Sequence, residues 1–277
     1  MSVVISSSYV IAPSATNGGI INGDNPVIGW DNVLGGLGLL STTTADPDFP
    51  TANMLTNSTN LRWKGAATEV DEYITVLNQG AGDIDYIAIA RHNLGSEQIP
   101  VSVEFLESVG PDVWTELVED VILPNDGPAL FRFPKLAYLG IRLRMQVDLE
   151  EPVVAVVYCG ELLVLQRRLY VGHAPINYSV ETRVANGMSE SGDFLGRIVL
   201  GEATSTQLQL VNLSPDWLRT YLAPFLAFAR SEPFFMAWRP EQYPLEVGYC
   251  WLTNDPKPVN QRSRGHMQVD LQMGGVT

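Results

Sequence analysis

The sequence predicts a mostly β protein made of two β-sandwich domains, the second of which carries one flanking helix at about residues 215–229. Short apolar segments recur between turns that contain glycine and proline, a pattern typical of antiparallel sandwiches and jelly rolls. The helix is predicted because apolar residues recur at helical spacing in one segment. An uneven distribution of charge favours two units with different surroundings.

The 277 residues carry a formal net charge of −14, and all of it lies in the first part of the chain. Residues 1–165 contain 7 Lys and Arg against 21 Asp and Glu, whereas residues 166–277 contain 10 of each. An acidic protein lacks the general attraction for phosphate that nucleic-acid binders use, so specific nucleic-acid binding is not expected. DNA could nevertheless pass along such a surface without adhering to it.

Residues 1–45 are predicted to form a glycine-rich N-terminal arm. An apolar piece at 3–11 is followed by many turn-prone residues, among them Gly18, Gly19, Gly23 and Gly35. This much glycine favours an extended segment or a series of turns over a packed element. Two interpretations remain open, which are a poorly ordered tail and an arm that orders on a neighbouring subunit.

Residues 46–165 are predicted to form an antiparallel sandwich or jelly roll. The apolar run at 84–90 is rich in β-branched residues and suits a strand buried on both faces. Further along, apolar residues alternate with Arg142 and Arg144, so that strand should have one face in water. The expected strands are 73–77, 84–90, 101–106, 114–118, 129–133, 138–145 and 153–158.

Three segments of this unit carry a resemblance to a known family. They are Phe49-Pro50-Thr51-Ala52-Asn53-Met54-Leu55, Leu61-Arg62-Trp63 and Asp85-Tyr86-Ile87-Ala88-Ile89-Ala90-Arg91-His92-Asn93-Leu94-Gly95-Ser96. Together they resemble the discoidin, or galactose-binding-like, jelly rolls found in tail proteins of tailed phages. The resemblance covers roughly residues 45–165 and implies a fold, with sugar binding as one of the functions that this fold supports.

A glycan site at the end of the 84–90 strand would use Arg62, Trp63, Arg91, His92 and Asn93. Carbohydrate sites pair an aromatic face with forked hydrogen-bond donors, and these side chains supply both. In the alternative interpretation, Trp63 fills the core, Asn93 holds a turn and Arg91 is solvated.

Residues 166–277 are predicted to place strands before and after the helix. Ser214 supplies an N-cap, and Pro215 and Asp216 suit the first helical turn. Apolar residues from Trp217 onward recur at helical spacing, and Pro224 should kink or divide the helix. A hairpin-like or longer flexible loop is expected at 186–192, and the expected strands are 178–185, 194–200, 206–210, 234–238, 247–253 and 266–273.

This second unit resembles the tube-like domain shared by tail tube and distal tail proteins, a β-sandwich with a flanking helix that assembles as rings. The resemblance rests on residues 214–218, 233–238, 243–244 and 247–252. Distal tail proteins usually place the tube-like domain first, so the order here departs from the family pattern and leaves the exact tail component undefined. The candidate ring interface is Trp217, Tyr221 and Phe225, and packing inside the domain is the alternative for these residues.

Few residues are placed for catalysis, metal binding or cofactor binding. His92, His173 and His266 are far apart, and none has a ligand-type spacing to another His or Cys. Carboxylate pairs such as Asp83 and Asp85 occur by chance in so acidic a chain. No cofactor, metal or enzymatic activity is therefore expected, and a glycan-degrading enzyme is the weakest alternative.

Cys159 and Cys250 each lie in an apolar run and are expected to be buried free thiols rather than a disulfide. The N-terminal residues lack the basic region and apolar core of a signal peptide. No apolar run reaches the roughly 20 residues of a transmembrane helix. We therefore expect a protein that is made in the cytosol and has no membrane anchor.

The two resemblances imply a structural component of a phage tail or tail-like particle, assembled in the host cytoplasm and carried in the virion. It would form a homo-oligomeric ring, hexameric by analogy with the family, at the distal end of the tail tube. Its partners would be the tail tube, tape-measure and hub or fibre proteins. The alternative is a host-glycan-binding adhesin module of the tail tip.

Overall fold

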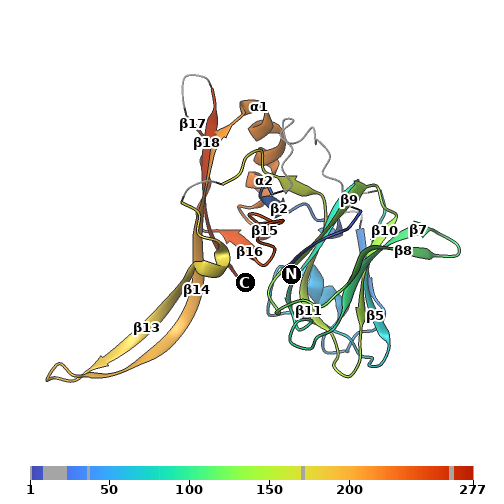
Figure 1. Ribbon diagram of the computed structural model, residues 1–277, viewed down its shortest axis with the longest axis horizontal. Helices are drawn as coiled ribbons and strands as arrows, with labels where there is room; N and C mark the ends of the chain where they lie inside the picture. Colours follow the sequence, from blue (N-terminus) through green and yellow to red (C-terminus); the bar gives the residue numbers. More distant parts are fainter. Residues whose placement is uncertain are drawn as a thin grey trace.

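A computed structural model shows a mostly β protein with one interrupted helix, which confirms the predicted fold class. The structure describes residues 2–8, 24–35, 38–80, 82–169, 172–261 and 265–276. In this part of the chain three β-sheets are stacked as layers, and the helix covers the far face of the third. Figure 1 shows the N-terminal unit, mostly blue and green, beside the C-terminal unit in yellow to red.

The first two sheets form the jelly roll, and we call them the outer sheet and the inner sheet. The outer sheet has the order β3 (Gly38–Thr42), β5 (Asp71–Asn78), β10 (Gly140–Gln146), β7 (Val101–Ser108) and β8 (Val113–Val121). The inner sheet has the order β1 (Val3–Ile5), β9 (Ala129–Leu136), β6 (Ile84–His92), β11 (Val153–Gly160) and β4 (Trp63–Lys64). Their pairings are antiparallel except for β1 with β9.

The outer sheet has one face in water, as the alternation in β10 predicts. Leu143 and its apolar neighbours point into the jelly-roll core, whereas Arg142 and Arg144 lie on the opposite, half-buried face. The Arg142 guanidinium lies 4.1 Å from the Tyr73 ring centre and 4.2 Å from the Trp114 ring centre. Cation–π contacts on both sides therefore hold this arginine against the sheet.

The inner sheet is buried on both faces, which confirms the prediction for its central strand β6. Ile87 and Ile89 point into the jelly-roll core, whereas Tyr86, Ala88 and Ala90 point into a second core. That second core is completed by residues of the third sheet, including Phe235, Val247 and Tyr249. A strand between two apolar cores loses the usual alternation of apolar and polar residues, which is why β6 is an almost unbroken apolar run.

The third sheet makes its own core with the helix. Its strand order is β12 (Leu162–Val164), β2 (Val27–Gly29), β15 (Phe234–Ala237), β16 (Val247–Leu252), β18 (Met267–Val276), β14 (Phe194–Leu213) and β13 (Val180–Met188), and β17 (Val259–Asn260) also pairs with β18. Leu208, Leu271 and Phe234 face the helix, which contributes Leu222 and Phe225. The third sheet therefore has the helix on one face and, over part of its length, the inner sheet on the other.

The helix predicted at 215–229 is present but is made of three pieces. They are α1 (Pro215–Trp217), a π-helical turn labelled η5 (Leu218–Leu222) and α2 (Ala223–Phe228). Pro224 has no N–H to donate to the preceding turn, so the chain widens there into a π turn. The Ser214 side chain does not cap the helix; its Oγ instead accepts a hydrogen bond from Gln166 Nε2 at 3.0 Å.

In the described part of the chain the N-terminal residues are not a separate arm. β1 and β3 belong to the jelly roll, whereas β2 lies in the third sheet between β12 and β15. This corrects the arm predicted for 1–45, although the glycines at 18, 19, 23 and 36 lie outside the described residues.

The boundary between the two units lies earlier than the predicted 165/166. The chain leaves the jelly roll after Gly160, and β12 already belongs to the third sheet because it pairs with β2. Short 3-10 helices occur at η2 (Val33–Gly35), η3 (Thr51–Leu55) and η4 (Ile176–Tyr178).

A long hairpin of β13 and β14 projects away from both units (Figure 1). The sequence predicts two strands at 194–200 and 206–210, but the structure joins them in one strand of 20 residues. Only the second half of β14, from Thr204 onward, pairs with β18; the first half pairs with β13 alone. The outer part of the hairpin is therefore a two-stranded ribbon without a packed layer beneath it.

Candidate interface and binding sites

Two of the residues predicted to bind a glycan, Trp63 and Asn93, instead make hydrogen bonds within the protein. Trp63 is fully buried in the jelly-roll core, where its Nε1 donates to the Thr44 carbonyl oxygen at 2.9 Å. Asn93 donates from Nδ2 to the Glu151 carbonyl oxygen at 3.0 Å and accepts from the Val153 N–H at 2.8 Å. Trp63 offers no aromatic face to a ligand in this arrangement, and Asn93 fixes the loop that enters β11.

His92, the third of these residues, is buried at the end of β6. Its Nδ1 accepts a hydrogen bond from the Leu94 N–H at 3.2 Å, and its Nε2 has no partner among the described residues. Burial lowers the pKa of His92 to about 4, although the nearby Asp126 carboxylate opposes the shift. At neutral pH the imidazole is uncharged, and it holds the turn after β6 through its hydrogen bond with the Leu94 N–H.

Arg62 and Arg91 are the exposed members of the predicted set. The Arg62 guanidinium lies 6.0 Å from the Phe49 ring centre, near the start of the jelly roll. Arg91 has a φ of 56°, a left-handed conformation that is uncommon for residues other than glycine. Its guanidinium forms no hydrogen bond or ion pair with any residue that the structure describes. Arg91 therefore presents unused donors at the surface.

Arg91 lies at the seam between the two units, where it lines two polar hollows. One hollow has a volume of about 290 Å³ and is also lined by Asp126 and Asn177; the other, of about 240 Å³, is lined by Asn60. Asn177 Oδ1 is buried and has no hydrogen-bond partner among the described residues. The sequence gives no signal for these neighbours, because they come from loops that are far apart along the chain.

The three helix residues predicted as a ring interface differ in exposure. Trp217 is 4% exposed and Phe225 is fully buried, and both belong to the core between the helix and the third sheet. Tyr221 is partly exposed and lines a cavity beside Trp30. Of these three side chains, Tyr221 is the one that reaches the surface.

An apolar surface that the sequence analysis does not identify lies on the projecting hairpin of β13 and β14. In the register of the hairpin, Val184 is opposite Val199 and Ala185 is opposite Ile198, so successive pairs place apolar side chains on opposite faces of the ribbon. On the hairpin, the large apolar side chains with 46–68% of their surface exposed are Val180, Met188, Phe194, Leu195, Ile198, Val199 and Leu200. An apolar run in a strand usually indicates burial, so the sequence alone does not reveal this exposure.

Asp85 is a buried carboxylate at the point where the chain passes between the units. Its Oδ1 accepts a hydrogen bond from the Leu162 N–H at 2.7 Å, which ties β6 to β12. Burial raises the pKa of Asp85 to about 7, although Arg132 opposes the shift. Asp83, by contrast, is exposed and lies 3.9 Å from Lys135 Nζ, so the Asp83 and Asp85 side chains have different surroundings.

Cys159 and Cys250 are buried free thiols, as predicted, and burial raises the pKa of both. In the residues that the structure describes, no three His, Cys, Asp or Glu side chains converge in a way that would hold a metal ion. None of the described helices is long and apolar enough to cross a membrane.

No family model matches the sequence, and a search of curated proteins finds no match. Among solved structures, a GH29 fucosidase of Ruminococcus gnavus in complex with fucose is similar at 13% identity, 47% coverage of this chain and a TM-score of 0.39. Chitosan-binding module 1 from a chitosanase/glucanase of Paenibacillus sp. IK-5 is similar over 47% of this chain and 99% of its own, at 12% identity and a TM-score of 0.40. CpGH89CBM32-5 of Clostridium perfringens, in complex with GalNAc-β-1,3-galactose, matches at 12% identity and a TM-score of 0.37, over 47% of this chain and 100% of its own. This chain spans 26% of the length of the fucosidase.

Proposed function

We propose that the protein is a structural subunit that assembles with copies of itself through the β13–β14 hairpin. The observation that carries this proposal is the set of large apolar side chains exposed on both faces of a projecting ribbon. Monomeric soluble proteins rarely expose apolar surface in contiguous patches, and an isolated two-stranded hairpin is only marginally stable in water. A neighbouring copy that covers the ribbon would bury these apolar side chains and stabilise the hairpin.

A closed ring suits this surface better than a twofold dimer. Because Ile198 and Val199 lie on opposite faces of the ribbon, each face needs a covering surface. In a ring with head-to-tail contacts each subunit has a neighbour on either side, so the hairpin of one copy can lie between surfaces of others. This arrangement supports the finer role that the sequence resemblance implies.

In that finer role the ring, a hexamer by analogy with the family, stands at the distal end of the tail tube of a phage or tail-like particle. It links the tube to hub or fibre proteins, contacts the tape-measure protein, and is assembled in the host cytoplasm before it is carried in the virion. The acidic jelly roll then decorates or extends the ring.

The test is the oligomeric state of the purified protein, measured by light scattering after size-exclusion chromatography and by electron microscopy. We expect closed rings for the native chain and monomers for the double variant Ile198→Asp, Val199→Asp. The control is Leu149→Asp, which places one such charge on an apolar side chain that is 72% exposed in the turn between β10 and β11. A native chain that stays monomeric at high concentration, or a double variant that still forms rings, would contradict the proposal.

A second candidate function, glycan binding at the tail tip, is favoured by the geometry around Arg91. Arg91, whose backbone is left-handed and whose guanidinium is unpaired among the described residues, lines two hollows that amide side chains also line. Forked donors of this kind suit sugar hydroxyl or carboxylate groups. On a glycan array, Arg91→Ala should abolish specific binding, whereas Arg62→Ala should retain it; equal binding by both variants would rule out this site.

A further inference from the structure

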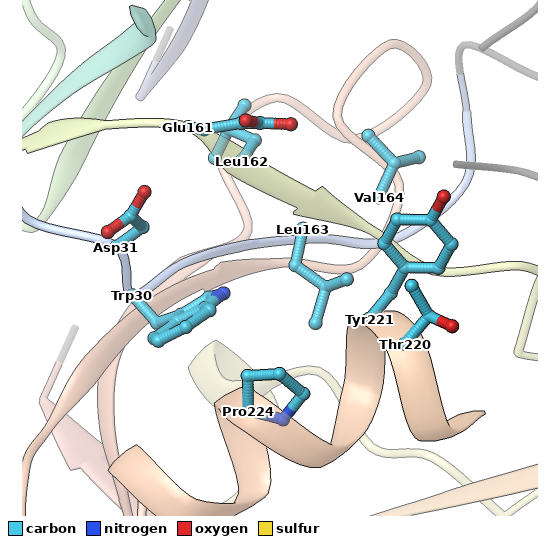
Figure 2. A pocket seen from close by; sticks show the side chains of 9 residues that line it. All are labelled: Trp30, Asp31, Glu161, Leu162, Leu163, Val164, Thr220, Tyr221 and Pro224. Atoms are coloured by element: carbon cyan, nitrogen blue, oxygen red, sulfur yellow. The ribbon is translucent and has the colours of Figure 1, made fainter. Parts of the chain in front are cut away.

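A separate cavity of about 210 Å³ lies where the jelly roll, the third sheet and the helix meet. Figure 2 shows Trp30 and Asp31 on one side of it and Tyr221 and Thr220 on the other, with Leu163 between them. Glu161, at the turn between β11 and β12, completes the wall. An apolar cavity of about 150 Å³ is enough to hold a benzene ring, so this one accepts a group of side-chain size.

The cavity wall carries two carboxylates that are short of positive charge. Partial desolvation and the neighbouring Glu161 carboxylate raise the pKa of Asp31 above its ordinary value. Asp31 forms no ion pair with any Lys, Arg or His among the described residues. Glu161 has one such partner, because Lys135 Nζ lies 2.6 Å from its Oε1. A cation placed in the cavity would relieve the repulsion between the two acids.

Trp30 gives the same cavity an aromatic wall in a fixed position. Its ring packs against Phe228 with ring centres 5.4 Å apart and against Phe225 at 6.3 Å. Its indole N–H makes no hydrogen bond within the described part of the chain. Of the aromatic side chains, tryptophan attracts cations most strongly, and guanidinium groups also stack on its face.

Two contacts with the inner sheet fix the backbone at Asp31, next to Trp30. The Asp31 carbonyl oxygen accepts a hydrogen bond from Tyr86 Oη at 2.7 Å. Gly160 packs so closely against the same carbonyl that a Cβ atom at this position would lie 2.3 Å from the oxygen. Both contacts come from the inner sheet, so the wall formed by Trp30 and Asp31 is organised before any ligand arrives.

We propose that this cavity binds an organic cation, a guanidinium or primary ammonium group carried on an apolar or sugar framework. The carboxylates of Asp31 and Glu161 would pair with the charge, and the Trp30 face would cover the framework. Two sources share this chemistry, which are a basic side chain of a protein partner and an amino sugar.

The test is a titration of the full chain, followed by calorimetry and by the NMR resonance of the Trp30 indole N–H. Arginine amide is compared with citrulline amide, which has the same shape without the charge, and glucosamine is compared with N-acetylglucosamine. We expect the charged member of at least one pair to shift the indole resonance and to bind at least tenfold more tightly than its neutral counterpart. The pair that does so identifies the source of the cation.

Two variants assign the binding to this cavity. Asp31→Asn and Glu161→Gln should each weaken cation binding at least tenfold, whereas the charge-matched control Asp112→Asn, in the turn between β7 and β8, should bind as the native chain does. Thermal melting of each variant checks that it is folded. Neutral and charged probes that bind equally, an indole resonance that does not respond, or full binding by both cavity variants would overturn the proposal.

Discussion

At the scale of single residues, the buried His92 makes the stability of the protein depend on pH. Its folded-state pKa of about 4 lies below the ordinary value of 6.5, so protonation favours the unfolded chain. The contribution is complete above pH 6.5 and is lost as the pH falls through about 4. At about 1.4 kcal/mol per pKa unit, the loss amounts to roughly 3 kcal/mol of the free energy of unfolding.

The variant His92→Asn tests this contribution, because the amide oxygen keeps an acceptor near the position of Nδ1 but does not titrate. Urea unfolding between pH 7 and pH 4 should show a smaller acid destabilisation in the variant than in the native chain, by about 3 kcal/mol. Parallel pH profiles for the two proteins would show that His92 is not the titrating group.

Gly160 is a second residue with a measurable role, since its missing side chain lets the two units approach. An added Cβ atom would lie 2.3 Å from the Asp31 carbonyl oxygen, and a backbone atom cannot move aside cheaply. Gly160→Ala should lower the free energy of unfolding by about 2 kcal/mol or more. Gly201→Ala, where no atom lies within 4 Å of the new Cβ, is the matched control in the same denaturation experiment.

Residue type predicts part of the candidate sites. One alternative from the sequence is that Trp63 fills the core and Asn93 holds a turn, and this follows from the chemistry of the two side chains. In the structure Trp63 is buried in the core and Asn93 makes two hydrogen bonds at the entry to β11. The residues that line the hollows beside Arg91 do not follow, because Asn60, Asp126 and Asn177 come from separate loops. A single sequence contains no pattern that links them.

At the scale of secondary-structure elements, the outer hairpin should be dispensable for folding. Its residues beyond Arg183 and Gly201 pair with each other and with no other strand in the described part of the chain. Replacing residues 184–200 by Asn-Gly, which favours a tight hairpin turn, should change the free energy of unfolding by less than about 1 kcal/mol. The same change should abolish oligomers, and a large loss of stability would show that the ribbon supports the fold.

Elements with a strong local pattern are predictable, and those that depend on distant partners are not. The strand β6, the wet face of β10 and the division of the helix near Pro224 all follow from the order of residues. β2 and β12 contain three residues each; they pair with each other across about 130 residues of chain, and β2 also pairs with the still more distant β15. Such short pieces carry no periodicity that could be recognised.

At the scale of the whole molecule, the two units share an apolar layer and should not behave as independent domains. The face of the inner sheet that the third sheet covers includes Tyr86, Leu130 and Tyr158, all buried. A fragment of residues 1–161 would expose this face to water. We expect the fragment to self-associate and to bind more of a hydrophobic dye than the intact chain does. A monomeric fragment that excludes the dye would contradict a shared core.

The position of β2 has a consequence for the time at which the protein becomes complete during synthesis. β2 ends at Gly29, but its neighbour β15 begins at Phe234, about 200 residues later. At roughly 5–20 residues per second, a ribosome needs about 10 to 40 s to supply that partner. The jelly roll has all its strands once Gly160 is made, and β12 then covers one edge of β2, but the edge that β15 covers stays open until the end of the interval. A chain terminated before β15 would therefore lack the strand beside β2, so the third sheet can be completed only when about the last sixth of the chain is made.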